Sequence, residues 1–177
     1  MLHINISKPD LYLTDELFDE EELILRNTVR EWVDREYIPL MENCYEEGRF
    51  PTETIKALGE MDLLGVFIPE AYGGAGMTHT CYGLACQELE RGDSGLRSFV
   101  SVQASLSMYA ILAFGSEEQK KRWLPPMCRG EVIGCFGLTE PDYGSNPGGL
   151  VTRAVKKGDH WILNGSKAWI TNGIVGP

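Results

Sequence analysis

The sequence has few basic residues for its length. It contains 16 lysines and arginines against 26 aspartates and glutamates among 177 residues, a formal net charge of −10. This excess of negative charge disfavours nucleic acid and anionic membranes as partners, and we expect neither. Residues 1–10 also lack both a long apolar run and an arginine-rich amphipathic pattern, so no secretion or transit signal is visible. Together these absences favour a soluble intracellular protein.

Paired cysteines and a dinucleotide motif are missing as well. The five cysteines are an odd set without a Cys-x-x-Cys pair. They therefore indicate neither a disulfide framework nor a zinc site, and we expect reduced, mostly buried thiols and no metal. The glycines of residues 69–78 do not complete the G-x-G-x-x-G pattern, which argues against a Rossmann fold.

The first part of the sequence has the periodicity of helices. Apolar residues recur at helical spacing over residues 18–33, which predicts an amphipathic helix that Pro39 should end or bend. Ser116 and Gln119 form a capping box, which predicts that a further helix begins at Glu117.

From Ile133 onward the pattern changes to short apolar runs separated by glycine and proline, as is typical of strands. Gly158, between Lys157 and Asp159, is expected at the turn of a hairpin. Helices followed by strands indicate the α+β class rather than alternating βαβ units. We therefore expect a helical domain over residues 1–131 and the start of a β-domain over residues 132–177.

Two stretches near the C-terminal end carry candidate ligand-binding chemistry. Residues 132–138 predict a short apolar strand that leads into a turn rich in glycine and hydroxyl groups, which suits a flat heteroaromatic ring or a pyrophosphate. In residues 164–173, Trp169 is positioned to stack on an aromatic cofactor. The alternative, which the residues alone favour, is that Trp169 is ordinary sheet core and the loop an ordinary turn.

A stretch rich in apolar and small residues nevertheless carries an arginine, Arg97. Arg97, Ser101 and Ser105 are spaced i, i+4 and i+8, so they share one face of a helix. A guanidinium forks onto a carboxylate, and a hydroxyl one turn away adds a donor, so this face is a candidate anion site. The alternative, which the residues alone leave equally open, is an internal pair of Arg97 with Glu90 or Asp93.

The two C-terminal stretches resemble the acyl-CoA dehydrogenase family. The sequence LTEPDYGS at 138–145, followed by NGSKAWITN at 164–172, is similar to two ordered motifs of that family's middle β-domain. The resemblance covers essentially the whole chain and implies an N-terminal helical domain followed by the opening strands of a barrel-like β-domain. It also implies FAD as the cofactor. The cofactor-side residues that it implies are Phe136, Gly137, Leu138, Thr139, Gly144, Ser145, Trp169, Ile170 and Thr171.

The segment ERGDSGLRSFVSVQ, which begins at residue 90, is similar to the glutaryl-CoA dehydrogenase branch of that family. The resemblance implies that Arg97 binds the carboxylate at the far end of the acyl chain, assisted by two serines and held from behind by Glu90. The substrate-side residues that it implies are Glu90, Arg97, Ser98, Ser101 and Ser145, the last of which also faces CoA.

The resemblance further implies the reaction and its partners. An acyl-CoA thioester, here glutaryl-CoA, loses hydrogen from its α and β carbons to FAD, and loss of CO2 then gives crotonyl-CoA. Electrons are expected to pass to an electron-transfer flavoprotein, and the full-length family member is expected to be a homotetramer. The family's catalytic glutamate lies in a C-terminal domain without a counterpart in these 177 residues, so we expect a truncated chain that has no catalytic base and is inactive alone. The expected compartment is the cytoplasm for a bacterial source and the mitochondrial matrix for a eukaryotic one.

Two other functions stay open at this point. The first alternative is another short-chain acyl-CoA dehydrogenase or an oxidase relative, which would have no use for Arg97. The second is a non-catalytic truncated stub or binding module.

Overall fold

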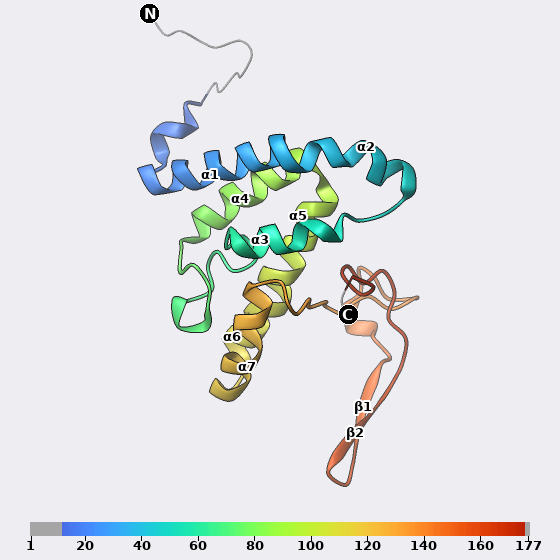
Figure 1. Ribbon diagram of the computed structural model, residues 1–177. Coiled ribbons are helices and arrows are strands. Elements are labelled where there is room, and N and C mark those ends of the chain that lie inside the picture. Colours follow the sequence, from blue (N-terminus) through green and yellow to red (C-terminus); the bar gives the residue numbers. More distant parts are fainter. Residues whose placement is uncertain (1–11, 176–177) are drawn as a thin grey trace, which may run out of the picture.

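The fold begins with a long helical rod. The computed structural model describes residues 12–175. After a short 3-10 turn, η1 (Thr14–Leu17), the rod consists of α1 (Glu20–Trp32), a π-helical segment η2 (Val33–Tyr37) and α2 (Ile38–Glu47) (Figure 1). A capping box starts the rod, because the Asp19 carboxylate accepts the Glu22 N–H at 2.9 Å while the Glu22 carboxylate accepts the Asp19 N–H at 3.2 Å.

The sequence predicted that Pro39 would end or bend the first helix, but the rod continues through Pro39. Pro39 lies in the first turn of α2, directly after the wide turn of η2, where its missing N–H is tolerated. The rod ends instead at Gly48, whose φ of +64° is the left-handed conformation that terminates many helices.

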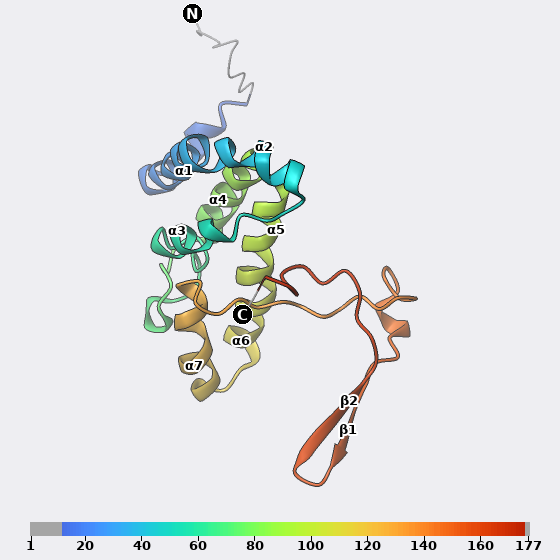
Figure 2. The same cartoon turned by 45° about the vertical axis from the view of Figure 1, so that its right-hand side comes forward.

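The next two helices fold back against the rod. A 3-10 turn, η3 (Thr52–Thr54), leads into α3 (Ile55–Glu60), and a loop that contains η4 (Glu70–Tyr72) connects it to α4 (His79–Gly92). Thr78 caps α4, since its hydroxyl accepts the Cys81 N–H at 3.1 Å. Helix α4 lies alongside α1 in both views of the ribbon (Figures 1 and 2).

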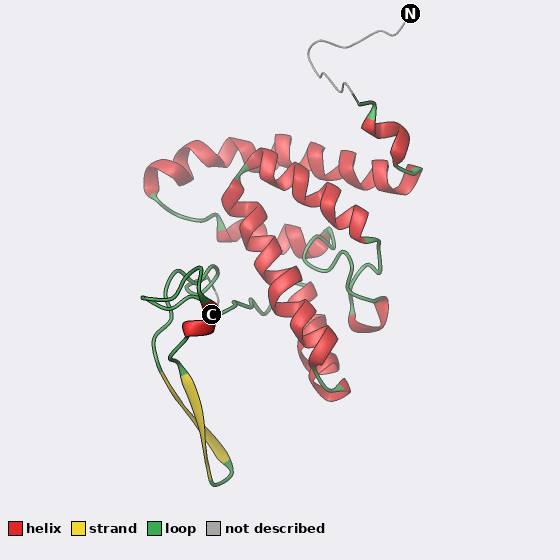
Figure 3. Ribbon diagram, turned by 180° about the vertical axis from the view of Figure 1, so that it is seen from behind, coloured by secondary structure: helices red, strands yellow, loops and turns green. Residues whose placement is uncertain are grey.

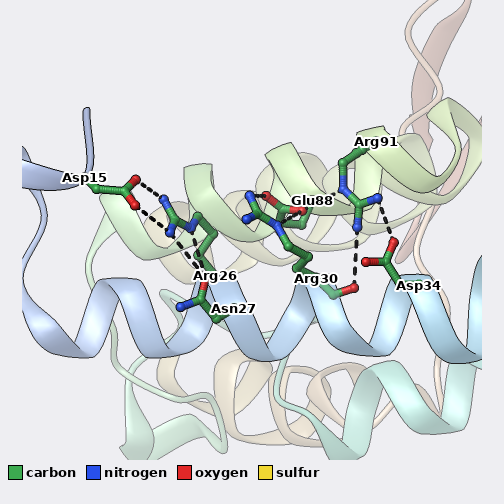
Figure 4. Close-up of polar contacts among 7 residues, drawn as sticks. All are labelled: Asp15, Arg26, Asn27, Arg30, Asp34, Glu88 and Arg91. Atoms are coloured by element: carbon green, nitrogen blue, oxygen red, sulfur yellow. Dashed lines mark hydrogen bonds and ion pairs between the residues drawn. The ribbon is translucent and has the colours of Figure 1, made fainter. Parts of the chain in front are cut away.

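A buried carboxylate joins α1 to α4 (Figure 4). The side chain of Glu88 in α4 has no exposed surface, and it accepts hydrogen bonds from Arg30 of α1 at 2.6 and 3.0 Å and from Arg91 at 2.8 Å. Arg91 in turn pairs with Asp34 of η2 at 2.7 Å. Burial alone would raise the pKa of Glu88, but the hydrogen bonds from the two arginines outweigh it and hold that pKa below its ordinary value.

A second continuous helix, which we call the long helix, runs from Ser94 to Phe114. It comprises α5 (Ser94–Ser101), the π-helical segment η5 (Val102–Met108) and α6 (Tyr109–Phe114). Asp93 caps it by accepting the Leu96 N–H at 2.9 Å. By length and composition alone this helix is apolar enough to cross a membrane, which is weak evidence because core helices share that property. One set of its apolar side chains packs into the helical core of the protein: Leu96, Phe99, Val100, Ala104 and Met108.

Helix α7 (Glu117–Cys128) completes the helical part and confirms the predicted start. Ser116 Oγ accepts the Gln119 N–H at 3.2 Å, and Gln119 Oε1 accepts the Ser116 N–H at 2.8 Å. The large side chains that are fully buried in the core come from all parts of the helical bundle: Tyr37, Leu58, Leu63, Leu64, Ile68, Leu89, Leu96, Phe99, Met108 and Leu124.

Beyond α7 the chain leaves the helices and forms a hairpin. Strands β1 (Arg153–Lys157) and β2 (His160–Asn164) pair antiparallel, and Gly158, at φ +66°, and Asp159 form the two-residue turn. The predicted hairpin is confirmed. All residues of both strands are exposed, and the hairpin stands clear of the helices (Figures 2 and 3). Helices followed by the start of a sheet confirm the α+β class.

The strand predicted over residues 132–138 was wrong. That segment is extended but pairs with no strand in the part of the chain that the structure describes. Within it, the Gly134 N–H donates to the side chain of Gln103, and the Gly134 carbonyl oxygen accepts a hydrogen bond from the side chain of Asn172. The polar backbone groups are therefore satisfied by side chains instead of by a neighbouring strand.

Candidate functional site

The two stretches that the sequence analysis singled out lie side by side. We call residues 134–146 the first segment and residues 164–173 the second segment. The Ala168 N–H donates to the Thr139 carbonyl oxygen at 2.9 Å, and the Lys167 ammonium donates to the Leu138 carbonyl oxygen at 2.9 Å. Each of these two contacts joins residues that lie 29 positions apart in the sequence.

A buried carboxylate, that of Glu140, holds this junction together. Its side chain is 1% exposed, and it accepts the N–H groups of Val151 and Thr152 at 2.8 and 3.0 Å and the Lys167 ammonium at 3.0 Å. Thr152, the N–H of Val151 and the Lys167 ammonium outweigh burial and lower the pKa of Glu140 to about 2. Glu140 therefore stays ionised and connects the first segment, the second segment and the two residues before β1.

Sequence reasoning missed the role of Glu140, although the signal was present. The first segment carries its glutamate directly before Pro141, and the second segment carries a single lysine, Lys167, so a cross-link between the two segments was available from charge alone.

The side chains predicted to face a cofactor are largely open. Trp169 is 93% exposed and has a φ of +57°, so it is not sheet core, and the alternative interpretation of Trp169 is wrong. Phe136 and Leu138 are each 42% exposed. Of the other residues predicted to face the cofactor, Thr139 and Ile170 are half-buried. The rest are exposed: Gly137, Gly144, Ser145 and Thr171.

Arg97 projects from the first turns of α5, where Glu90 of α4 meets it. Arg97 Nε donates to Glu90 Oε2 at 2.5 Å, and Ser94 Oγ donates to the other Glu90 oxygen at 2.7 Å. These hydrogen bonds lower the pKa of Glu90, with Arg97 as the larger cause, and the same contact with Glu90 raises the pKa of Arg97. The internal pair that the sequence analysis left open is present, with Glu90 as the partner.

The Nη1 end of the guanidinium points along the helix face that carries Ser101 and Ser105. Arg97 Nη1 lies 3.4 Å from Ser101 Oγ, which itself donates to the Ser98 carbonyl oxygen at 3.1 Å. Ser105 Oγ, one turn further, donates to the Ser101 carbonyl oxygen at 2.6 Å. The side chain of Arg97 is 36% exposed, so one edge of its fork stays accessible to an anion.

A groove connects the long helix with the first segment. It has a volume of about 550 Å³, and its lining is mainly apolar. Leu106 and Ile111 line it from the long helix, Trp123 from α7, and Phe136 from the first segment. A residue predicted to face the cofactor, Phe136, and the helix that carries Arg97 therefore border the same space.

No group of three or more histidine, cysteine, aspartate or glutamate side chains among residues 12–175 is arranged to hold a metal ion. The polar groups of this region are the two ion pairs, Arg97 with Glu90 and Lys167 with Glu140, together with the hydroxyl groups and the backbone of the two segments.

Comparisons with known proteins relate the chain to a family. The family model described as acyl-CoA dehydrogenase, N-terminal domain, matches residues 19–131, and the model described as acyl-CoA dehydrogenase, middle domain, matches residues 135–175. The short-chain specific acyl-CoA dehydrogenase of Rattus norvegicus mitochondria is 42% identical over 153 residues, which are 86% of this chain and 37% of that protein.

Solved structures agree with these matches. A glutaryl-CoA dehydrogenase from Mycobacterium smegmatis in complex with FADH2 has a TM-score of 0.91 and 53% identity, and the match covers 94% of this chain and 43% of that one. A glutaryl-coenzyme A dehydrogenase in complex with glutaryl-CoA has a TM-score of 0.84 and 38% identity, over 88% of this chain and 40% of that one. The chain thus spans about two fifths of the length of these relatives.

Proposed function

The chain belongs to the acyl-CoA dehydrogenase family, and from that premise we propose that it is the part of a flavoenzyme that binds FAD and the acyl chain of glutaryl-CoA. The proposed reaction is α,β-dehydrogenation of the thioester followed by decarboxylation to crotonyl-CoA, with electrons passed to an electron-transfer flavoprotein. We further propose that residues 1–131 form the helical domain and residues 132–177 open the middle β-domain. The relative from Mycobacterium smegmatis, a glutaryl-CoA dehydrogenase with FADH2, supports this assignment.

The residues of the two segments fit a flavin. A flat ring needs an apolar or aromatic face to lie against and backbone or hydroxyl groups at its polar edge. Trp169 offers an almost completely exposed indole, while Thr139 lies beside it through the hydrogen bond between Ala168 and the Thr139 carbonyl. When bound, FAD would supply the hydride acceptor, and the chain would supply orientation and hydrogen bonds.

The observation that carries the substrate assignment is the arrangement of Arg97. Glu90 accepts from Nε, so the side chain is held in one orientation while Nη1 faces Ser101 and the side chain remains 36% exposed. A preoriented guanidinium that keeps donors free suits a carboxylate, which accepts two parallel hydrogen bonds. An uncharged acyl chain would leave these donors unused at a cost in desolvation.

Neither Glu90 nor Glu140 suits the removal of the α-proton. Glu140 is bound by two N–H groups and an ammonium, and Glu90 is bound by Arg97 and Ser94, so each carboxylate is stabilised in its charged form. A general base needs a pKa near the working pH, and both pKa values are shifted the other way. The α-proton is therefore expected to go to a group other than these two carboxylates.

The experiment is a comparison of two substrates with the protein purified from its source together with its flavin. In Arg97→Ala, kcat/KM for glutaryl-CoA should fall about 10- to 150-fold, because hydrogen bonds between charged groups contribute about 1.5–3 kcal/mol. Activity on butyryl-CoA, which has no distal carboxylate, should change little. Arg35→Ala is the matched control, since Arg35 is exposed and pairs with the adjacent, exposed Glu36.

An equal loss for both substrates would mean that Arg97 has a structural role. A wild-type protein that oxidises butyryl-CoA and ignores glutaryl-CoA would instead support a short-chain acyl-CoA dehydrogenase, the function named for the rat relative.

A further inference from the structure

A buried glutamine connects the arginine helix to the first segment. Gln103 lies in η5, six residues after Arg97 in the same continuous helix, and it has no exposed surface. Its side-chain Nε2 donates to the carbonyl oxygens of Met127 at 2.9 Å and Val132 at 2.8 Å. Its Oε1 accepts the Gly134 N–H at 2.7 Å. Both amide protons and the amide oxygen are thus used to bind backbone groups around the exit from α7.

A second amide holds the opposite side of the same glycine. Asn172 Nδ2, in the second segment, donates to the Gly134 carbonyl oxygen at 3.3 Å and to the Phe99 carbonyl oxygen of α5 at 3.2 Å. Gly134 is therefore fixed to the long helix through its N–H by Gln103 and through its carbonyl by Asn172.

Gly134 also passes in direct contact with the helix. A Cβ atom at this position would lie 2.6 Å from Ser107 Cβ and 2.8 Å from Met127 Cε, which leaves no room for a side chain. The close approach and the two amides together leave the first segment little freedom to slide along the helix.

We propose that Gln103 is a positioning residue that sets the spacing between Arg97 and the flavin-side residues of the first segment. Six residues of helix correspond to a rise of about 9 Å, and the two residues from Gly134 to Phe136 span at most about 7 Å. The path from the proposed carboxylate site to the proposed flavin site therefore runs through the Gln103 amide, with the Asn172 amide as a second link. This inference rests on the proposed function, because it matters only if one acyl chain must reach both places.

The amide chemistry explains why glutamine suits this position. An apolar side chain would leave the Val132 carbonyl oxygen and the Gly134 N–H without a partner and would remove one of the donors to the Met127 carbonyl oxygen. A carboxylate would have no proton for either carbonyl. The first segment would then shift to find other partners. A misplacement of about 1 Å can cost about a hundredfold in rate when two reacting parts must be aligned.

The test uses the flavin-loaded protein with glutaryl-CoA and butyryl-CoA. In Gln103→Leu, the ratio of kcat/KM for glutaryl-CoA to that for butyryl-CoA should fall roughly 10- to 100-fold, because only the dicarboxylic chain is held at both ends. In the Arg97→Ala background, the same substitution should leave the ratio unchanged. Asn172→Ala removes the second link and should lower the ratio in the same direction, which keeps the inference testable if Gln103→Leu does not fold.

A purely structural role for Gln103 predicts different results. It would lower both activities equally, as expected for the control Val29→Ala, which truncates a fully buried side chain of α1, a helix that takes no part in the hydrogen bonds of the two amides. An unchanged ratio in both amide variants, with a wild type that prefers glutaryl-CoA, would overturn the inference and leave the proposed function intact. A wild type that does not oxidise glutaryl-CoA would overturn both.

Discussion

The buried ion pairs of Glu88 should contribute more to the stability of the helical domain than its exposed ion pairs do. Glu88→Gln keeps the shape of the side chain but removes its charge and places an NH2 group against two arginines. Removing one partner of a buried ion pair costs about 3–5 kcal/mol. Arg30 and Arg91 are 30% and 40% exposed and can recover water, so we expect the lower end of that range, about 3 kcal/mol. For a protein of this size the melting temperature should fall by roughly 6–12 °C.

Urea unfolding followed by far-UV circular dichroism measures this loss, because the helices dominate that signal. The control is Glu60→Gln, the same chemical change in an exposed i, i+4 pair with Lys56, which should cost less than about 0.5 kcal/mol. Because the folded pKa of Glu88 is lowered, its contribution is present above the unfolded pKa near 4.5 and is lost as the pH falls through the folded value. Equal losses in the two variants at neutral pH would refute the reasoning.

Three further perturbations probe other contacts. Protonation of Glu140 should separate the first and second segments as the pH falls from about 4.5 towards about 2, because its pKa is lowered by its partners; amide NMR should show the transition, and Glu140→Gln should lack it. Gly59→Ala should lower the free energy of unfolding by about 1–3 kcal/mol in thermal melts, since the new Cβ would lie 2.5 Å from a carbonyl oxygen at the end of α7. The control Gly83→Ala meets no atom within 4 Å and should raise the stability of the protein. Trp169→Ala should weaken FAD binding about tenfold in a fluorescence titration and Trp161→Ala should not; equal effects would argue against stacking on Trp169.

Local signals in the sequence were sufficient for much of the helical domain. The capping box of Ser116 and Gln119 predicted the start of α7, and the glycine between Lys157 and Asp159 predicted the hairpin turn, because each depends on residues within a few positions. The strand at residues 132–138 was mispredicted for the opposite reason. Its apolar pattern fits a strand, but the partners of Gly134 come from positions 31 and 38 residues away, which no local pattern specifies.

The site shows the same division between local and long-range information. The spacing of Arg97 and Ser101 on one face follows from helix geometry and is confirmed by their 3.4 Å contact. The exposure of Trp169 could not be predicted, since a tryptophan in a β-branched run fits a sheet core equally well. Gln103 was missed because a buried polar side chain is recognised by the groups around it, and these groups lie elsewhere in the sequence.

Helix α4 links the stability of the fold to the orientation of the proposed substrate site. Glu88 and Glu90 are two residues apart, so they face different sides of the helix. Glu88 binds Arg30 of the rod, while Glu90 binds Arg97 on the long helix. One short helix thus uses two carboxylates to fix its own position and to orient the arginine. Loss of the Glu88 contacts would free α4 to move, and the Glu90 carboxylate that orients Arg97 would move with it.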